Sequence, residues 1–237
     1  VDMTPGRVIC LVTAVMVVCV PGLGWNQIIS GQTVPTSTGL PATIPLFPLE
    51  DVVLFPSMSR PFHIFEPRYR EMVADAVQGD GMIGMVLLRP GFETEYEGNP
   101  AVFSIGCAGE ISDAEELPDG RWMIVLRGFV KFRIIREDQS RAYRVANVEA
   151  IPESFSEGDQ VALREYRDRL STVFTAMAPG AQAPPSNLTD EELVNGLSQF
   201  LELGPLVRQS LLESEGPLAR AETLLELVSE LESENPK

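Results

Sequence analysis

The sequence is poor in the residues on which most enzyme chemistry depends. It contains two lysines, Lys131 and Lys237, and one histidine, His63. Neither lysine follows a Gly-x4-Gly-Lys-Ser/Thr loop, so the chain lacks the phosphate cradle of a P-loop nucleotide site. A Ser-Lys dyad needs a desolvated lysine beside a serine, and neither lysine has a setting typical of one. We therefore expect no catalytic residues and no enzyme activity.

Cysteine is also scarce, with Cys10, Cys19 and Cys107 only. The first two lie in an apolar N-terminal run, and without that run Cys107 has no partner for a disulfide. One histidine and no Cys-x-x-Cys pair leave scattered carboxylates as metal ligands, so we expect no metal and no cofactor. A nucleophile pair of Cys107 and His63, in an uncharacterised hydrolase, stays as a remote alternative.

Positive charge is in short supply as well. The formal net charge is −16 and the pI about 4.4, which disfavours a nucleic-acid partner because an acidic surface repels phosphates. The charge is uneven: residues 121–144 hold seven basic and two acidic side chains, whereas residues 190–237 hold three basic and eleven acidic ones. Either these stretches are solvated faces, or they dock on one another or on a partner by charge.

No apolar run reaches the ~20 residues of a full membrane span, but Val8–Val20 is uncharged, with Arg7 before it and Pro21–Gly24 after it. This pattern indicates a signal peptide over 1–24, or an uncleaved anchor tethered through 8–23. Either reading predicts an exported, periplasmic or membrane-tethered bacterial protein. A third reading is a mis-assigned start, since the first residue is Val1, and a cytoplasmic protein. Residues 25–43 are rich in Thr, Ser, Gly and Pro and predict a flexible linker.

Short apolar runs predict a β subdomain over residues 44–152. Pro45, Pro48 and Pro56 interrupt the first two runs, which favours irregular or edge strands. Pro67–Gln78 predicts the single helix of this part, with Pro67 in its first turn and Gly79 after its end. Further strands are expected at Met82–Leu88, Val102–Ile111, Arg121–Leu126, Phe129–Ile135 and Tyr143–Val148, with a break at Gly128.

From residue 158 to residue 234 the apolar spacing becomes helical. Thr189 and Glu192 form a capping-box pattern at the start of one of four short helices. Helices of this length are unstable alone, so they must pack on each other or on the β part. The predicted class is therefore α+β: a pseudo-β-barrel of mainly antiparallel strands with one helix, followed by a C-terminal helical bundle.

A series of short motifs occurs in order along the β part: Leu46–Leu49 (LFPL), Val53–Pro56 (VLFP), Ile64–Met72 (IFEPRYREM), Ile105–Ile111 (IGCAGEI), Leu117–Arg121 (LPDGR) and Leu126–Ile134 (LRGFVKFRI). Together they resemble the N-terminal, substrate-binding domain of Lon proteases. The resemblance implies a pseudo-barrel followed by helices, and recognition of other polypeptides without their cleavage. Neither the ATPase nor the Ser-Lys protease domain of full Lon proteases has a counterpart here.

The resulting hypothesis is a non-catalytic peptide- or protein-binding module that presents clients to a protease or chaperone. The alternative is a scaffold that docks one folded partner through its helices; the oligomeric state stays open. We expect the loop from Arg89 to Asn99 to form a binding edge. The candidate substrate-binding residues are Phe92, Tyr96, Phe65 and Tyr69, and the motif residues expected to be mainly structural are Glu66, Pro67, Arg68, Asp119, Gly120, Arg121 and Gly128.

Overall fold

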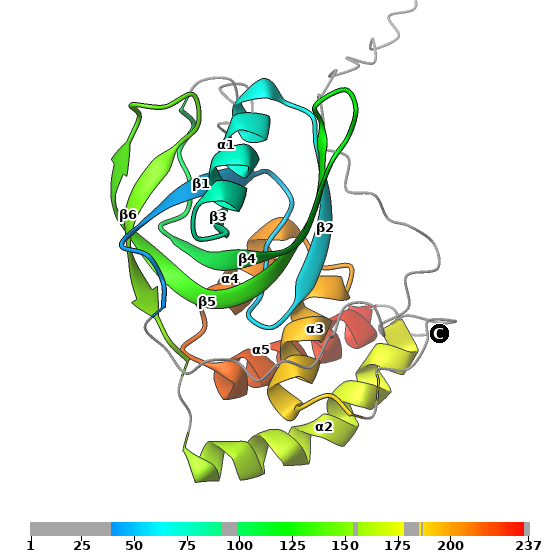
Figure 1. The fold of residues 1–237 in the computed structure, drawn as a ribbon. Helices are drawn as coiled ribbons and strands as arrows, with labels where there is room; N and C mark the ends of the chain where they lie inside the picture. The colour runs from blue at the N-terminus through cyan, green and yellow to red at the C-terminus, as the bar shows by residue number, and fades with distance from the viewer. Residues whose placement is uncertain (1–38, 92–98, 154–155, 178–184, 186, 235–237) are drawn as a thin grey trace, which may run out of the picture.

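A computed structural model describes residues 39–91, 99–153, 156–177, 185 and 187–234. Over these residues the chain forms one six-stranded sheet and five helices (Figure 1). The sheet part contains β1 (Thr43–Leu49), β2 (Ser59–Ile64), α1 (Pro67–Gln78), β3 (Met82–Leu87), β4 (Ile105–Glu116), β5 (Trp122–Asp138) and β6 (Val145–Ile151). The later part contains α2 (Glu157–Met177), α3 (Asp190–Phe200), α4 (Pro205–Glu213) and α5 (Pro217–Glu234).

The sheet curls because its longest strand, β5, pairs with β2 along its N-terminal half and with β6 along its C-terminal half. The strand order is β2-β5-β4-β3-β1-β6, and the C-terminal half of β5 also pairs with β6. The pairing β1–β3 is parallel and the other pairings are antiparallel. The α+β class is confirmed, but the predicted barrel is an irregular curled sheet with β2 added outside it.

The prolines of β1 do not place it at an edge of the sheet, as the sequence suggested. Residues 43–45 of β1 pair with β6, whereas residues 46–49 pair with β3. Each stretch therefore uses one side of its backbone for these pairings, and Pro45 and Pro48 remove a donor that the other side does not need. Val52–Phe55 is buried but forms no strand, and β2 was not predicted as a strand.

The predicted break at Gly128 is wrong, because β5 runs through it as one strand. The register of β4 and β5 shifts there, with Ala108 opposite Val130 and Gly109 opposite Gly128. A side chain at Gly128 would collide with the carbonyl oxygen of Phe55, so the glycine allows two backbones to approach closely. The extra residue is absorbed as a bulge rather than as a strand end.

The turn between β4 and β5 and the helix α1 both follow the local pattern. Gly120 has φ of +76°, a conformation that few residues other than glycine adopt, and its N–H donates to the carbonyl of Leu117 at 2.8 Å. Figure 1 shows α1, in cyan, across the mouth of the curled sheet. Tyr69, Met72, Val73 and Ala76 form its buried side.

The four later helices share a buried core with the sheet, and the predicted C-terminal helical bundle is not confirmed as a unit of its own. Leu163, Leu193 and Leu211 belong to the same buried cluster as Phe47 and Phe62. Polar bonds also join the two parts: the amide of Gln199 accepts from Phe55 N at 3.1 Å and donates to Ser59 O at 3.3 Å, and Asn195 donates to Pro56 O at 3.1 Å. The capping box of Thr189 and Glu192 is present.

Within the part of the chain that the structure describes, none of the helices combines the length and the apolar character needed to cross a bilayer. The predicted segment 8–23 lies outside these residues.

Candidate functional site

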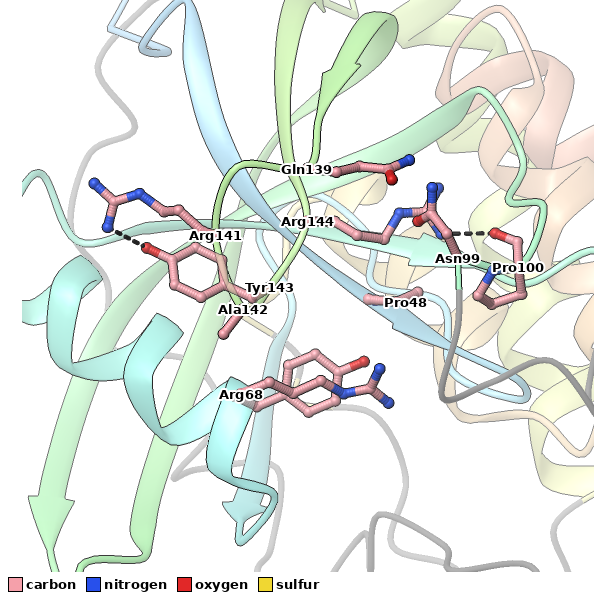
Figure 2. Close-up of a pocket in the computed structure, with 10 residues that line it drawn as sticks. Pro48, Arg68, Asn99, Pro100, Gln139, Arg141, Ala142, Tyr143 and Arg144 are labelled. Atoms are coloured by element: carbon pink, nitrogen blue, oxygen red, sulfur yellow. Dashed lines mark hydrogen bonds between the residues drawn. The ribbon is translucent and has the colours of Figure 1, made fainter.

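A cavity of about 400 Å³ opens between the start of α1 and the segment that connects β5 to β6 (Figure 2). Four separate stretches of chain meet there: the end of β1, the first turn of α1, the residues before β4 and residues 139–144. The polar lining residues are Arg68, Asn99, Gln139, Arg141 and Arg144, and the others are Pro48, Tyr69, Pro100, Ala142 and Tyr143. We call this cavity the arginine pocket.

Among the residues that the structure describes, the lining of the arginine pocket contains three guanidinium groups and no carboxylate. This is unusual for a chain with a formal net charge of −16. Two of the arginines, Arg141 and Arg144, come from the basic stretch 121–144 that the sequence singled out. The pocket is therefore a local cationic site on an acidic protein.

Carboxylates outside the lining hold the guanidinium groups in position. Arg68 Nε donates to Glu66 Oε2 at 3.0 Å. Arg144 Nε donates to Glu137 Oε2 at 2.8 Å, and its Nη1 donates to the carbonyl oxygen of Pro100 at 2.7 Å, as Figure 2 shows for the second bond. A guanidinium group is rigid and planar, so hydrogen bonds at two of its edges also fix the direction in which its remaining N–H groups point.

Arg141 and Tyr143 share one acidic partner on α1. The hydroxyl of Tyr143 donates to Asp75 Oδ2 at 2.6 Å and accepts from Arg141 Nη1 at 3.0 Å, and Arg141 forms an ion pair with Asp75. Burial, reinforced by the hydrogen bond to the Asp75 carboxylate, raises the pKa of Tyr143 to about 12. These bonds fasten the β5–β6 connection to α1 and so determine the width of the pocket.

Tyr69 serves both the core and the pocket. It is 3% exposed, and its ring lies 4.8 Å from that of Phe47, centroid to centroid. The guanidinium of Arg68 lies 4.7 Å from the centre of the same ring, close enough for a cation–π interaction. One face of the site is thus a rigid aromatic wall with a cation beside it.

The structure brings together only some of the residues that the sequence nominated for binding. Tyr69 lines the pocket, and so does Asn99, where the proposed binding loop ends. Phe65 is half-buried, with its ring 6.1 Å from that of His63, and does not line the pocket. Phe92 and Tyr96 lie outside the described residues.

Sequence reasoning missed the contribution of residues 139–144. The excess of basic residues in this stretch was the available signal, but a strand-like charge pattern is also typical of a solvated face. Its meeting with α1 depends on the pairing of β6 with β1, where Leu46 N donates to Arg144 O at 2.8 Å.

The motif residues occupy turns and helix ends. Glu66 is the N-cap of α1 and pairs with Arg68, although its side chain makes no capping hydrogen bond, and Pro67 is in the first turn. At the β4–β5 turn, Asp119 accepts from the backbone N of Arg121 at 3.2 Å and from its Nε at 2.6 Å. The hydrogen bond from the backbone N–H of Arg121 lowers the pKa of Asp119, and the guanidinium of Arg121 lowers it further.

His63 and Cys107 do not form a nucleophile pair at this site, since neither residue lines the pocket. Cys107 is fully buried, and the loss of solvent raises the pKa of its thiol. His63 lies on β2, opposite Met123 of β5. The arginine pocket therefore contains neither of the two groups on which the hydrolase alternative depends.

Comparison with known proteins decides the family. Residues 43–230 match the family model described as the ATP-dependent protease La (LON) substrate-binding domain. The chain belongs to this family. The matched Lon domain carries neither the ATPase nor the protease domain, in agreement with the expectation of a non-catalytic chain.

Two curated Lon proteases show how much of the Lon architecture is matched. The chain is 27% identical to Lon protease 2 of Syntrophobacter fumaroxidans over 193 residues, and 25% identical to the Lon protease of Trichlorobacter lovleyi over 197 residues. These matches cover 77% and 80% of this chain but 24% of each relative. The chain thus spans about a quarter of the length of the Lon proteases that it matches.

Solved Lon domains match over nearly their full length. A Lon N-terminal domain protein from Xanthomonas campestris is 30% identical, with a TM-score of 0.57 and coverage of 78% of this chain and 97% of that one. The N-terminal domain of Mycobacterium avium complex Lon protease has a TM-score of 0.60 at 17% identity, with coverage of 79% and 98%. The second likeness concerns the fold alone.

Proposed function

We propose that this chain is a polypeptide-binding module and that the arginine pocket receives part of an unfolded or extended client. The observation that carries the proposal is the composition of the pocket: guanidinium groups, side-chain amides and tyrosine rings surround one cavity. Such a mixture of apolar walls and a few fixed polar groups is typical of ligand sites. Membership of the Lon substrate-binding family supports the same class of ligand.

The proposed client is a polypeptide rather than a nucleotide or a nucleic acid. The net charge of −16 opposes the approach of a phosphate backbone. In contrast, Asn99 and Gln139 offer amide groups that can pair with a peptide backbone, and Pro48 and Pro100 offer apolar contact beside them. In the cell, the module would hold such clients for a protease or a chaperone.

Fluorescence anisotropy tests the proposal with the 237-residue chain and a labelled polypeptide that reduction and alkylation keep unfolded. We expect saturable binding of the unfolded polypeptide, weaker binding after Arg141→Gln, and no binding of the same polypeptide in its folded form. Arg164→Gln is the matched control, because Arg164 is 79% exposed on α2 and does not line the pocket. Equal binding by the two variants and the parent chain would show that the client binds outside the arginine pocket.

A folded partner that docks on the helices is the second candidate. Val161 of α2, Phe200 of α3 and Leu206 of α4 are 60%, 38% and 50% exposed, respectively. Single exposed apolar side chains are common, so this candidate requires that they act together. A stoichiometric complex that Leu206→Ser and Val161→Ser abolish, while Arg141→Gln leaves it unchanged, would favour the scaffold.

The location of the protein follows from residues 1–24 in this proposal. Their apolar run directs export, or tethers the chain through residues 8–23. Cell fractionation, together with mass spectrometry of the N-terminus of the natural protein, tests this directly. A mature N-terminus near residue 25 indicates cleavage, an intact membrane-bound chain indicates an anchor, and a cytoplasmic chain that starts downstream contradicts both.

A further inference from the structure

The three guanidinium groups of the arginine pocket define a narrower ligand class than polypeptide binding in general. We infer that the pocket binds a carboxylate of the client, either the free C-terminal carboxylate or that of an acidic side chain. This inference rests on the proposed function. It narrows the ligand class from polypeptides in general to polypeptides with an accessible carboxylate.

The charges around the cavity are arranged in two tiers, with arginines at the cavity and acids behind them. Arg68, Arg141 and Arg144 line the cavity, whereas their partners Glu66, Asp75 and Glu137 do not. The acids therefore fix the arginines without occupying the cavity. An incoming carboxylate meets cations first, and charge-assisted bonds to Arg are among the strongest hydrogen bonds in proteins.

Arg141 uses only one of its three guanidinium nitrogens in hydrogen bonds with the described residues. The hydrogen bonds of Arg141 to described residues start from Nη1, which reaches Asp75 and the hydroxyl of Tyr143. Its Nε and Nη2 form an edge with the spacing of a carboxylate's two oxygens, and its side chain is 53% exposed. Arg144 is 11% exposed and is already held by Glu137 and Pro100, so it contributes fixed positive charge at the cavity wall.

The remaining walls favour a peptide over a small inorganic anion. The cavity of about 400 Å³ exceeds what a single carboxylate needs and lies within the size range of ligand pockets. Tyr69 and Pro48 provide an apolar wall for a side chain next to the carboxylate. Capture of a terminal carboxylate is a known mode of peptide recognition.

Three labelled peptides with the same apolar sequence test the inference on the full chain. The first has a free C-terminal carboxylate, the second a C-terminal amide, and the third a C-terminal amide with one glutamate near the end. We expect at least one carboxylate peptide to bind about tenfold or more tightly than the uncharged amide, because a charged hydrogen bond contributes that much. Tight binding of the first peptide shows that the pocket recognises a C-terminal carboxylate. Tight binding of the third peptide shows that it recognises the carboxylate of a side chain.

Two variants at one position separate recognition from folding. Arg141→Gln should remove most of the preference for the carboxylate peptides over the amide peptide. Arg141→Lys keeps the charge but loses the fork, so it should restore part of the preference. Arg164→Gln serves as the control for the loss of one positive charge. Circular dichroism of each variant shows whether the fold is retained.

The two proposals fail in distinguishable ways. Equal binding of all three peptides, or a preference that persists in Arg141→Gln, overturns the carboxylate inference and leaves polypeptide binding in place. Binding of the unfolded polypeptide without any binding of the carboxylate peptides does the same. If neither the peptides nor the unfolded polypeptide bind, both proposals are wrong.

Discussion

Lys131 of β5 forms a buried ion pair with Glu153, in the segment that connects β6 to α2. The Nζ atom lies 2.8 Å from Oε1, and the side chains are 2% and 5% exposed. Arg220 of α5 binds the same carboxylate, and its guanidinium lies 5.4 Å from the centre of the Phe55 ring. Lys131 also donates to Ser214 O at 2.6 Å. One carboxylate thus joins the sheet to the helices.

Glu153→Gln should destabilise the chain strongly, since it leaves two buried cations without a counter-charge. Breaking one side of a buried ion pair costs about 3–5 kcal/mol. Chemical denaturation, followed by circular dichroism, measures the change in the free energy of unfolding. Arg164→Gln removes an exposed pair with Asp190 at 3.8 Å and should cost about 1 kcal/mol or less. Similar costs for the two variants would contradict the role given to Glu153.

Gly128→Ala should destabilise the sheet, because the new methyl group collides with the carbonyl of Phe55. Overpacking of this kind costs about 1–3 kcal/mol, and a backbone atom cannot move aside as a side chain can. Gly158→Ala on α2 is the control, since the added Cβ meets only Ser156 Oγ at an ordinary 3.5 Å and alanine favours a helix. Thermal melts should therefore shift in opposite directions, and a neutral Gly128→Ala would show that the two backbones separate easily.

Tyr143 should make stability fall at high pH. Its pKa in the folded chain is about 12, against 10.0 for an unperturbed tyrosine, so the folded chain retains a proton that the unfolded chain releases. The stabilisation is fully present below pH 10 and is lost as the pH rises towards 12. Denaturation at a series of pH values, with tyrosinate absorbance recorded in parallel, checks this. Tyr143→Phe should abolish the late tyrosinate step; its persistence would assign that step to another tyrosine.

Phe92→Ala combined with Tyr96→Ala tests the predicted binding loop. Both residues belong to the stretch that leads to Asn99 at the edge of the arginine pocket. We expect weaker binding of an unfolded polypeptide, because aromatic side chains carry much of the energy of recognition. The melting temperature should stay the same, since loop residues contribute less to stability than core residues. Unchanged binding would exclude the loop as a binding edge.

Local patterns were predictable because each depends on a few neighbouring residues. The bounds of α1 follow from Pro67 and Gly79, and the capping box follows from the spacing of Thr189 and Glu192. The tight turn at Gly120 follows from the Asp-Gly pair. Backbone conformation and capping are decided within one or two turns of chain, where the amino-acid sequence is the whole context.

The strand partners of β1 and the surroundings of the basic residues depended on contacts between remote parts of the chain. The prolines of β1 favoured an edge strand, yet β1 exchanges partners along its length and pairs with both β6 and β3. The basic stretch 121–144 was read as a solvated or docking face. Folding buries Lys131 at the sheet–helix junction and places Arg141 and Arg144 at the pocket. Arg133 and Arg136 are exposed, as expected of a solvated face.

The amino-acid sequence by itself determined the family, the α+β class, the separate helices and the scarcity of catalytic side chains, since composition, period and motif order are properties of the chain. Only the tertiary structure placed Arg68 and Tyr69 of α1 opposite Arg141 and Tyr143, some seventy residues away. That meeting depends on the curl of the sheet and on the bond of Tyr143 to Asp75. Distances between remote residues arise from packing, which no local pattern encodes.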